Sequence, residues 1–524
     1  MKKLLFLLAL ALAPVSCVRS YIEARSENVD TTGTPDHEMI ILGNQLEDPY
    51  SVVNVTKAVQ SLYPAASERI KVEPTDYYVR FLPENQEQFD VLSALGVDML
   101  DHPMDYEILR EGDYYIDPEI GENEITWQYS VVKKDFEFPK GICYEILDEC
   151  YLAENAPTKA PGIDWDAVER EAYRLTGNEG MLLPETKGGA SSGTPSGRIS
   201  IVDPLYDSEP VGVAGVRVSC NSFVKFASAY TDDEGYYQMS KSYSTNIRYR
   251  IVFKNKKGFA IGFNLLLVPA SVSTLGKNSP EGVSVVVDED SDSKLFARCA
   301  ANNAGYDYYC SCNTSGGRMK SPPSNLRIWM FHSLSASSAV MMQQGAIIDN
   351  SIIGEFLGDY SSLVKMFLPD VTIGLGGSEF NYAAIYGGVV HEMAHASHFM
   401  QVGTSYWDTY IKFILTSFVS SGGVTYGVGT EKNAGYAEIG EMWAYYVETM
   451  MYRDRYEGST SSFGTSFWFY PQIFLYLNER GLDRYKIYAA LTPDVTDRTV
   501  LQSRLLSLYP EYKNVINQAF LRYL

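Results

Sequence analysis

The segment VVHEMAHASHF, residues 389–399, contains three of the six histidines in this 524-residue chain. In a helix, the spacing of His391 and His395 puts both imidazoles on one face, separated by about 40° of rotation and about 6 Å of rise. Glu392 completes the H-E-x-x-H pattern, in which two histidines grip a metal ion and the glutamate takes a proton from water that the ion activates. We therefore expect a buried helix with His391 and His395 as zinc ligands and Glu392 as the catalytic base.

The residues around this motif are apolar and two glycines precede it, as a buried helix in close contact with its neighbours requires. We expect the helix to cover residues 378–402 and to end near Gly403. The segment before it, residues 370–376, predicts an edge strand on which an extended substrate would bind by strand addition. The alternative is that the two histidines belong to a core and hold no metal.

Two histidines leave a zinc ion one protein ligand short. The metzincin pattern would continue with a glycine and a third histidine, but His398 and Gln401 occupy those positions. His398 lies about 10 Å along the helix axis from His391, so it is expected to pack beside the site, with direct ligation as the alternative.

A downstream segment, GEMWAYYVE at residues 440–448, resembles the NEGFAxYxE-type helix of gluzincins, the thermolysin- and aminopeptidase-like zinc peptidases. The resemblance implies a zincin-type catalytic domain with Glu441 as the third metal ligand. Four further positions match the aromatic residue, alanine, tyrosine and acid of that helix: Trp443, Ala444, Tyr446 and Glu448. Gly440 and Met442 depart from the pattern.

The sequence leaves open the roles of several other residues on or near this helix. Glu438 precedes Glu441 by three residues on nearly the same helix face, so it is either the alternative ligand or a carboxylate that orients a histidine. Many thermolysin-like proteins have an aspartate four residues after the glutamate ligand, whereas this chain has Tyr445, so the partner of either histidine is not identified. A donor to the developing oxyanion is also expected. The candidates are Tyr382, Tyr386, Tyr426 and Tyr436.

The N-terminus, MKKLLFLLALALAPVSC, has a basic start and an apolar stretch too short to span a bilayer, which predicts a secretory signal over residues 1–17. It resembles a bacterial lipoprotein signal, which implies a lipid on Cys17. Residues 18–37 would then be a tether. We expect an exported lipoprotein at the bacterial outer membrane or cell surface, held to the membrane only by this anchor, with a periplasmic or secreted protein as the alternative.

The net charge of −22 argues against nucleic acid as a partner. An exported chain can form disulfides, and the sequence suggests Cys143 with Cys150, and Cys299 with either Cys310 or Cys312. The oligomeric state is left open.

Segments ahead of the motif predict two further domains. Alternating strand and helix patterns over residues 38–185 indicate a small α/β domain, which is either a pro-segment that covers the active site or a spacer or binding domain. Residues 186–197, TKGGASSGTPSG, read as a linker. The pattern GVRV…TDDEGYYQM within residues 198–257 resembles the carboxypeptidase regulatory-like family, which implies a non-catalytic, transthyretin-type β-sandwich.

The expected fold is therefore multidomain α+β, with a zincin-type catalytic domain of mixed sheet and active-site helices over residues 258–524. We expect one zinc ion and a protein or peptide substrate. The resemblance implies a metallopeptidase. An endopeptidase acting on extracellular or surface proteins is favoured, because the Gly-x-M-x-N motif of related aminopeptidases is absent. The alternative is a non-catalytic surface-binding lipoprotein on the same scaffold.

Overall fold

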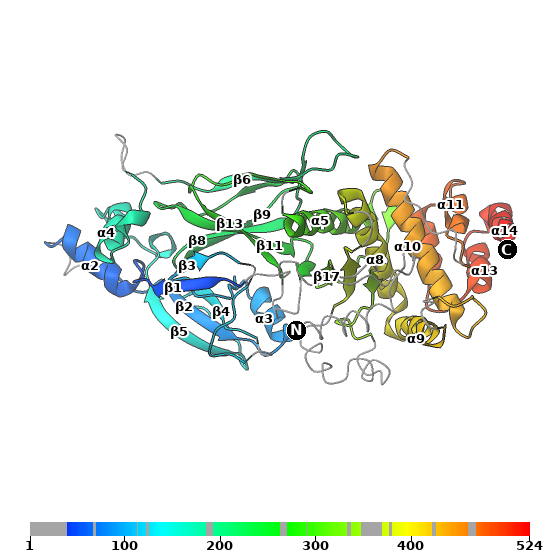
Figure 1. Cartoon of the computed structure of the whole chain (residues 1–524), viewed down its shortest axis with the longest axis horizontal. Helices are drawn as coiled ribbons and strands as arrows, with labels where there is room; N and C mark the ends of the chain where they lie inside the picture. The colour runs from blue at the N-terminus through cyan, green and yellow to red at the C-terminus, as the bar shows by residue number, and fades with distance from the viewer. Residues whose placement is uncertain are drawn as a thin grey trace, which may run out of the picture.

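The computed structural model describes residues 39–65, 70–112, 114–121, 125–184, 192–262, 270–290, 292–332, 337–346, 369–376, 380–421, 426–458 and 468–523. The predicted signal, Cys17, the tether and residues 186–191 of the predicted linker lie outside these residues. Within them the chain is a mixed α+β protein with several sheets (Figure 1). No helix in the described ranges is long and apolar enough to cross a membrane.

Residues 39–184 form the first unit, drawn in blue to cyan in Figure 1. Its elements are β1 (Ile41–Gln45), α2 (Val52–Leu62), β2 (Asp76–Leu82), α3 (Gln86–Ala94), β3 (Tyr106–Arg110), β4 (Gln128–Lys133), β5 (Cys143–Cys150) and α4 (Trp165–Leu175). Strand β2 lies between β4 and β5 and is antiparallel to both, while β1 pairs with β3. The predicted order is confirmed from β1 to α3. The strand expected at residues 97–100 is reduced to one bridge between Leu100 and Tyr129.

The suggested disulfides are wrong, and all six cysteines after Cys17 are free thiols. Cys143 and Cys150 are the two ends of β5, about 23 Å apart at the usual rise of a strand. Cys299 and Cys310 lie on one helix, α5 (Ser293–Ser311), about 16 Å apart along its axis, and Cys312 lies just beyond its end. A disulfide needs Cα atoms within about 7 Å.

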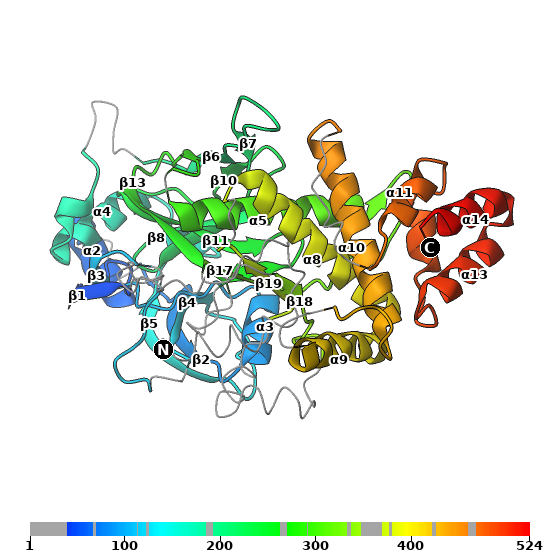
Figure 2. The ribbon, with the colours of Figure 1, turned by 45° about the vertical axis from the view of Figure 1, so that its right-hand side comes forward.

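Two sheets face each other in the middle of the chain, drawn in green in Figures 1 and 2. One contains β6 (Ser196–Ile201), β7 (Val211–Gly212), β10 (Tyr236–Gln238) and β14 (Val285–Val287); the other includes β8 (Val216–Ser222), β9 (Lys225–Tyr230), β11 (Ile247–Asn255) and β13 (Val272–Asn278). Side chains such as Ile199, Val218 and Ile251 fill the core. At the Asp-Glu-Gly turn that precedes β10, Gly235 has φ +82° and a Cβ there would meet the Ile199 carbonyl oxygen, so only glycine fits.

The second sheet continues past residue 257 into the part of the chain expected to be the catalytic domain. Beyond β11 it adds β12 (Ala260–Gly262), β17 (Arg327–Phe331), β19 (Val371–Gly374) and β18 (Ser338–Ala339). Strands β12, β17 and β19 are parallel, and β18 pairs antiparallel with β19. The edge strand is therefore β18 and not residues 370–376 as predicted, because the chain before β19 folds back to pair with it.

Helices cover this end of the sheet and form the C-terminal part of the molecule (Figure 2). They are α5, α8 (Tyr382–Val402), α9 (Thr404–Ser421), α10 (Ala434–Arg455), α11 (Gln472–Asn478), α12 (Arg484–Ala490), α13 (Arg498–Leu508) and α14 (Lys513–Arg522), with a small hairpin of β15 (Asn313–Thr314) and β16 (Gly317–Arg318) after α5. The expected helix end at Gly403 is confirmed: this residue has φ +81° and its N–H donates to the Phe399 carbonyl.

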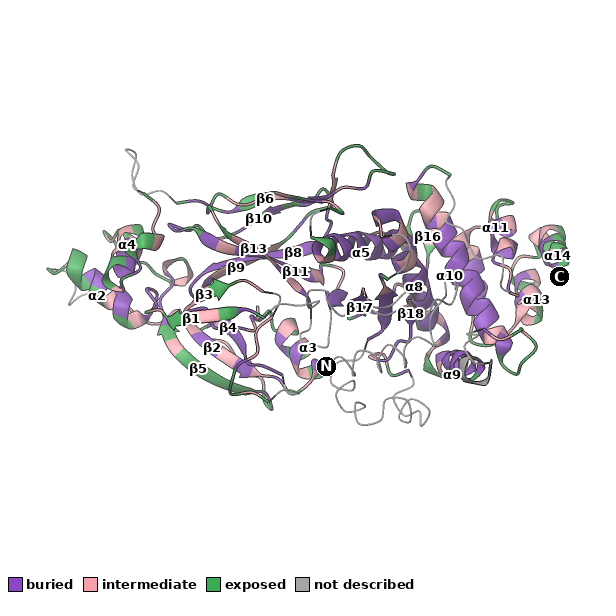
Figure 3. Cartoon of the chain, viewed as in Figure 1, coloured by how far each residue is buried: buried purple, intermediate pink, exposed green. Residues whose placement is uncertain are grey.

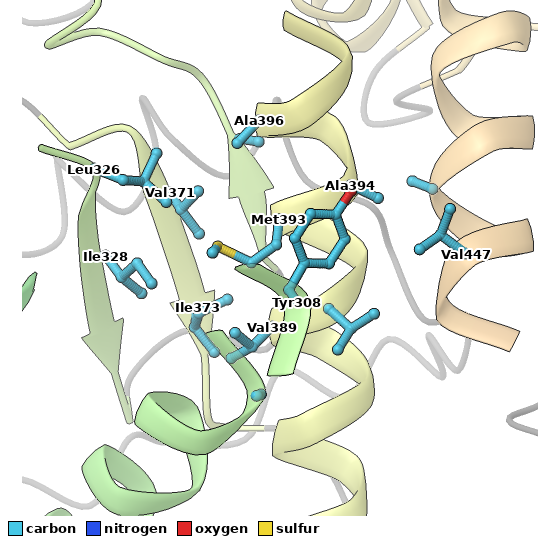
Figure 4. Close-up of a cluster of buried hydrophobic side chains, with 14 of the residues drawn as sticks. Tyr308, Leu326, Ile328, Val371, Ile373, Val389, Met393, Ala394, Ala396 and Val447 are labelled. Atoms are coloured by element: carbon cyan, nitrogen blue, oxygen red, sulfur yellow. The ribbon is translucent and has the colours of Figure 1, made fainter. Parts of the chain in front are cut away.

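Helix α8 is buried along almost its whole length, as the purple ribbon in Figure 3 shows. Its Val389 and Met393 side chains face Ile328 of β17 and Ile373 of β19 (Figure 4). Because the sheet covers one side of α8 and α10 the other, polar groups on this helix are placed out of contact with bulk water.

The first unit packs against the large sheet through side chains of opposite charge. The acids belong to residues 39–184 and the bases to the sheet and its adjoining loop. The pairs are Glu169–Lys225 (2.8 Å), Glu111–Arg248 (2.9 Å), Asp90–Arg327 (2.9 Å), Glu154–Lys241 (3.7 Å) and Asp98–Arg217. In all five pairs the acid belongs to the first unit and the base does not, so complementary charges help to orient the first unit on the sheet.

We expect Asp90→Asn to lower the free energy of unfolding by about 1–2 kcal/mol, because it removes the carboxylate that pairs with the nearly buried Arg327 guanidinium. Urea unfolding of the parent and variant measures this, with the exposed Asp135→Asn as the matched control. In a double-mutant cycle with Arg327→Gln the coupling should be about 1 kcal/mol. An Asp90→Asn variant as stable as the control would contradict the role of this pair.

Candidate metal centre

The centre is built where α8 and α10 pack side by side. The Trp443 indole N–H of α10 donates to the Ala394 carbonyl of α8 at 3.2 Å, and both residues are buried. Ala394 faces Val447 across this contact (Figure 4). The small alanine side chain allows the two helices to approach closely, so that the nearby Glu441 of α10 can reach the histidines of α8.

The structure brings three predicted ligands together. Glu441 Oε2 lies 3.5 Å from His391 Nε2 and 3.6 Å from His395 Nε2. Among the described residues, these three form the one group of histidine, cysteine or carboxylate side chains that could hold a metal, with ligand atoms within 4.8 Å of one another. A tetrahedral zinc ion about 2.0–2.1 Å from each ligand separates ligand atoms by about 3.3 Å, close to the two distances from Glu441 to the histidines.

The ionisation of the triad carboxylate follows from its partners. Burial acts to raise the pKa of Glu441, but His395 and His391 outweigh it and hold that pKa well below its usual range. Burial also lowers the pKa of His395, against the attraction of Glu441. A divalent metal ion takes a carboxylate anion and neutral imidazoles as ligands, so its binding to this group would release any proton that the histidines hold.

Glu392 lies beside the triad and is 1% exposed. Its Oε2 has no hydrogen-bond partner among the described residues. Burial raises the pKa of Glu392 to about 8; His391 opposes the shift, and Glu441 and Glu448 add to it. A bound dication would favour the ionised form and so oppose this rise. The position suits a group that exchanges protons inside a dry site.

Glu448 supplies the histidine partner that the sequence left unidentified. Its Oε2 lies 3.1 Å from His391 Nδ1, so the carboxylate holds the ring with Nε2 toward Glu441. Glu448 comes seven residues after Glu441, close to two helical turns, which returns it to the same face of α10. This seven-residue spacing can be read from the sequence and could have placed Glu448 on the same face as Glu441, but Glu448 was identified there only as the acid of the motif.

The structure separates Glu438 from the histidines. Its carboxylate forms an ion pair with Arg498 of α13, at the start of that helix. Burial raises the pKa of Glu438 to about 7, with Arg498 opposing the shift. Glu438 therefore joins α10 to the C-terminal helices and is not part of the triad.

His398 packs in the core and is 0% exposed. Its ring contacts Tyr406 and Trp407 with centroids 5.5 and 5.9 Å away, and neither ring nitrogen has a hydrogen-bond partner among the described residues. Burial lowers its pKa to about 3, and His395 adds to the shift. His398 therefore lies among aromatic rings of α9 and outside the triad.

The tyrosines nearest the triad are not the four expected from the sequence. Tyr410 of α9 donates to Glu441 Oε1 at 2.6 Å, and the Tyr445 ring lies 4.5 Å from that of His391. The expected candidates contact other groups: Tyr382 and Tyr386 lie against Arg455, Tyr426 against Phe469, and Tyr436 against Tyr406. The spacing of Tyr406, Trp407 and Tyr410 on α9 was the available signal for an aromatic face turned toward α8.

In comparisons with known proteins, no family model, no curated protein and no solved structure matches this chain.

We expect Glu441→Gln to reduce the zinc content of the purified protein well below one ion per chain, because an amide cannot supply the anionic ligand. Glu438→Gln is the matched control: it makes the same replacement of a buried carboxylate one turn away on α10 and should retain zinc. Metal analysis by mass spectrometry after dialysis gives both values. Equal zinc in the two variants would show that Glu441 is not a ligand.

We expect Glu448→Gln to weaken zinc binding about 10- to 100-fold, because groups that orient a metal-binding histidine typically contribute this much. Competition with a chromogenic chelator measures the dissociation constant. Exposed Glu479→Gln serves as the control. An unchanged constant in Glu448→Gln would remove this carboxylate from the metal centre.

Proposed function

We propose that this chain is a zinc-dependent peptidase that hydrolyses peptide bonds in proteins or peptides. The supporting observation is the buried triad of His391, His395 and Glu441, with Glu392 beside it. The packing of the two helices also supports the proposal. The helix with the H-E-x-x-H motif, α8, lies directly beside the helix that carries Glu441, α10.

In this proposal the triad of His391, His395 and Glu441 binds the metal and Glu392 transfers protons. A zinc ion on the triad would supply Lewis acidity, which polarises the peptide carbonyl and makes water a nucleophile at neutral pH. Glu392 accepts the proton of the attacking water and returns it to the leaving amine. Glu448 keeps the His391 ring in place through Nδ1. The aromatic side chains around the histidines exclude bulk water, which strengthens each of these interactions.

The fold offers an edge strand for an extended substrate. Strand β18 is the last strand of the large sheet and lies beside α8, and we propose that an extended peptide binds along this end of the sheet. This favours an endopeptidase that acts on stretches of extended chain. With the predicted lipoprotein signal, the finer proposal is a zincin-type enzyme with transthyretin-like strands built into its framework, acting on extracellular or surface proteins.

We expect Glu392→Gln to lower kcat/KM for peptide hydrolysis at least about 100-fold while zinc content stays near one ion per chain, because only proton transfer is lost. Casein and a fluorogenic peptide library are suitable substrates, with Glu479→Gln as the matched control. Cleavage that persists in Glu392→Gln would exclude this residue as the base. A parent protein that binds zinc and cleaves no peptide would favour the non-catalytic binding protein instead.

A further inference from the structure

Helix α9 comes between α8 and α10 in the sequence, and no motif that predicts the metal site includes it. It follows α8 directly after Gly403 and packs against both α8 and α10. Its buried face contains Tyr406, Trp407 and Tyr410. Two of these rings contact His395, at centroid distances of 5.8 Å for Trp407 and 5.9 Å for Tyr410.

Trp407 fixes α9 to the edge of the sheet. Its indole N–H donates to the carbonyl of Ala339, in β18, at 3.1 Å. The Trp407 and Tyr410 rings lie 4.8 Å apart on neighbouring turns of the helix. Because Trp407 and His395 enclose the Tyr410 ring, its hydroxyl has little freedom of direction.

That hydroxyl is directed at the predicted third ligand. Tyr410 donates to Glu441 Oε1 at 2.6 Å, a length typical of a charge-assisted hydrogen bond to a carboxylate. The other oxygen, Oε2, is the one that lies 3.5 and 3.6 Å from the two histidine nitrogens. The two oxygens of Glu441 therefore have different partners.

We propose that Tyr410 is a positioning residue that restricts Glu441 to binding the metal through Oε2 alone. This inference rests on the proposed metal site. With Oε1 held by the hydroxyl, the carboxylate cannot turn both oxygens to the ion, and positions on the metal stay open for water and for the substrate carbonyl. Through Trp407, the same helix ties the orientation of Glu441 to the edge strand that would receive the peptide.

The test compares Tyr410→Phe with Tyr406→Phe. Both variants lose one buried hydroxyl from α9, but the Tyr406 hydroxyl donates to the Val495 carbonyl at 3.2 Å and does not contact the triad. We expect the zinc dissociation constant to rise about 10-fold in Tyr410→Phe and to stay at the parent value in Tyr406→Phe. We also expect the visible absorption of the cobalt-substituted protein to weaken only in Tyr410→Phe, because a second carboxylate oxygen raises the coordination number.

A cycle with Glu441→Gln shows whether Tyr410 acts through the carboxylate. Adding Tyr410→Phe to Glu441→Gln should not weaken zinc binding further. The inference is overturned if Tyr410→Phe matches the parent in both affinity and cobalt spectrum, if Tyr406→Phe changes both equally, or if the effect persists in the Glu441→Gln background. A parent chain that binds no zinc would overturn the proposed function itself, whereas normal zinc binding in the parent with an unaffected Tyr410→Phe would overturn only this inference.

Discussion

The contact of one carboxylate with two imidazoles inside the protein is the interaction that organises this half of the chain. Glu441 is 0% exposed, and a carboxylate buried without partners would be strongly destabilising. The two histidine nitrogens on α8 and the Tyr410 hydroxyl on α9 offset that cost. Because these partners come from different helices, α8, α9 and α10 must be packed in one arrangement before the carboxylate is satisfied.

Contacts outside the triad hold α8 and α10 at this spacing. Near one end, the Arg455 guanidinium of α10 pairs with Asp203, just after β6, and with Asp307 of α5, and it lies against the Tyr382 ring at the start of α8. Near the other end of α8, the Tyr488 hydroxyl of α12 donates to the Ser397 carbonyl. The two helices that carry the triad are thus held by the facing sheets on one side and by the C-terminal helices on the other.

Sequence patterns predicted the local parts of the site and missed those that depend on distant contacts. The H-E-x-x-H spacing gave His391 and His395 a common face, and the motif on α10 identified Glu441 as the group to join them. The role of Glu448 needed the relative rotation of two helices, which no single helix pattern contains. The cysteine pairings failed because an unbroken strand and an unbroken helix keep those residues apart.

The continuity of the large sheet could not be predicted from the sequence either. Strand β12 pairs with β17 across more than sixty residues, and no sequence motif marks this pairing. This continuity shows that the strands ahead of the H-E-x-x-H motif are not a separable domain. A detachable accessory domain would contribute no strand to the sheet that supports α8, yet β11 pairs with both β8 and β12. Asp203 also reaches Arg455 of α10. These strands and the candidate metal centre therefore share one framework, so a substitution in the strands can alter the spacing of His391 and Glu441 without touching either residue.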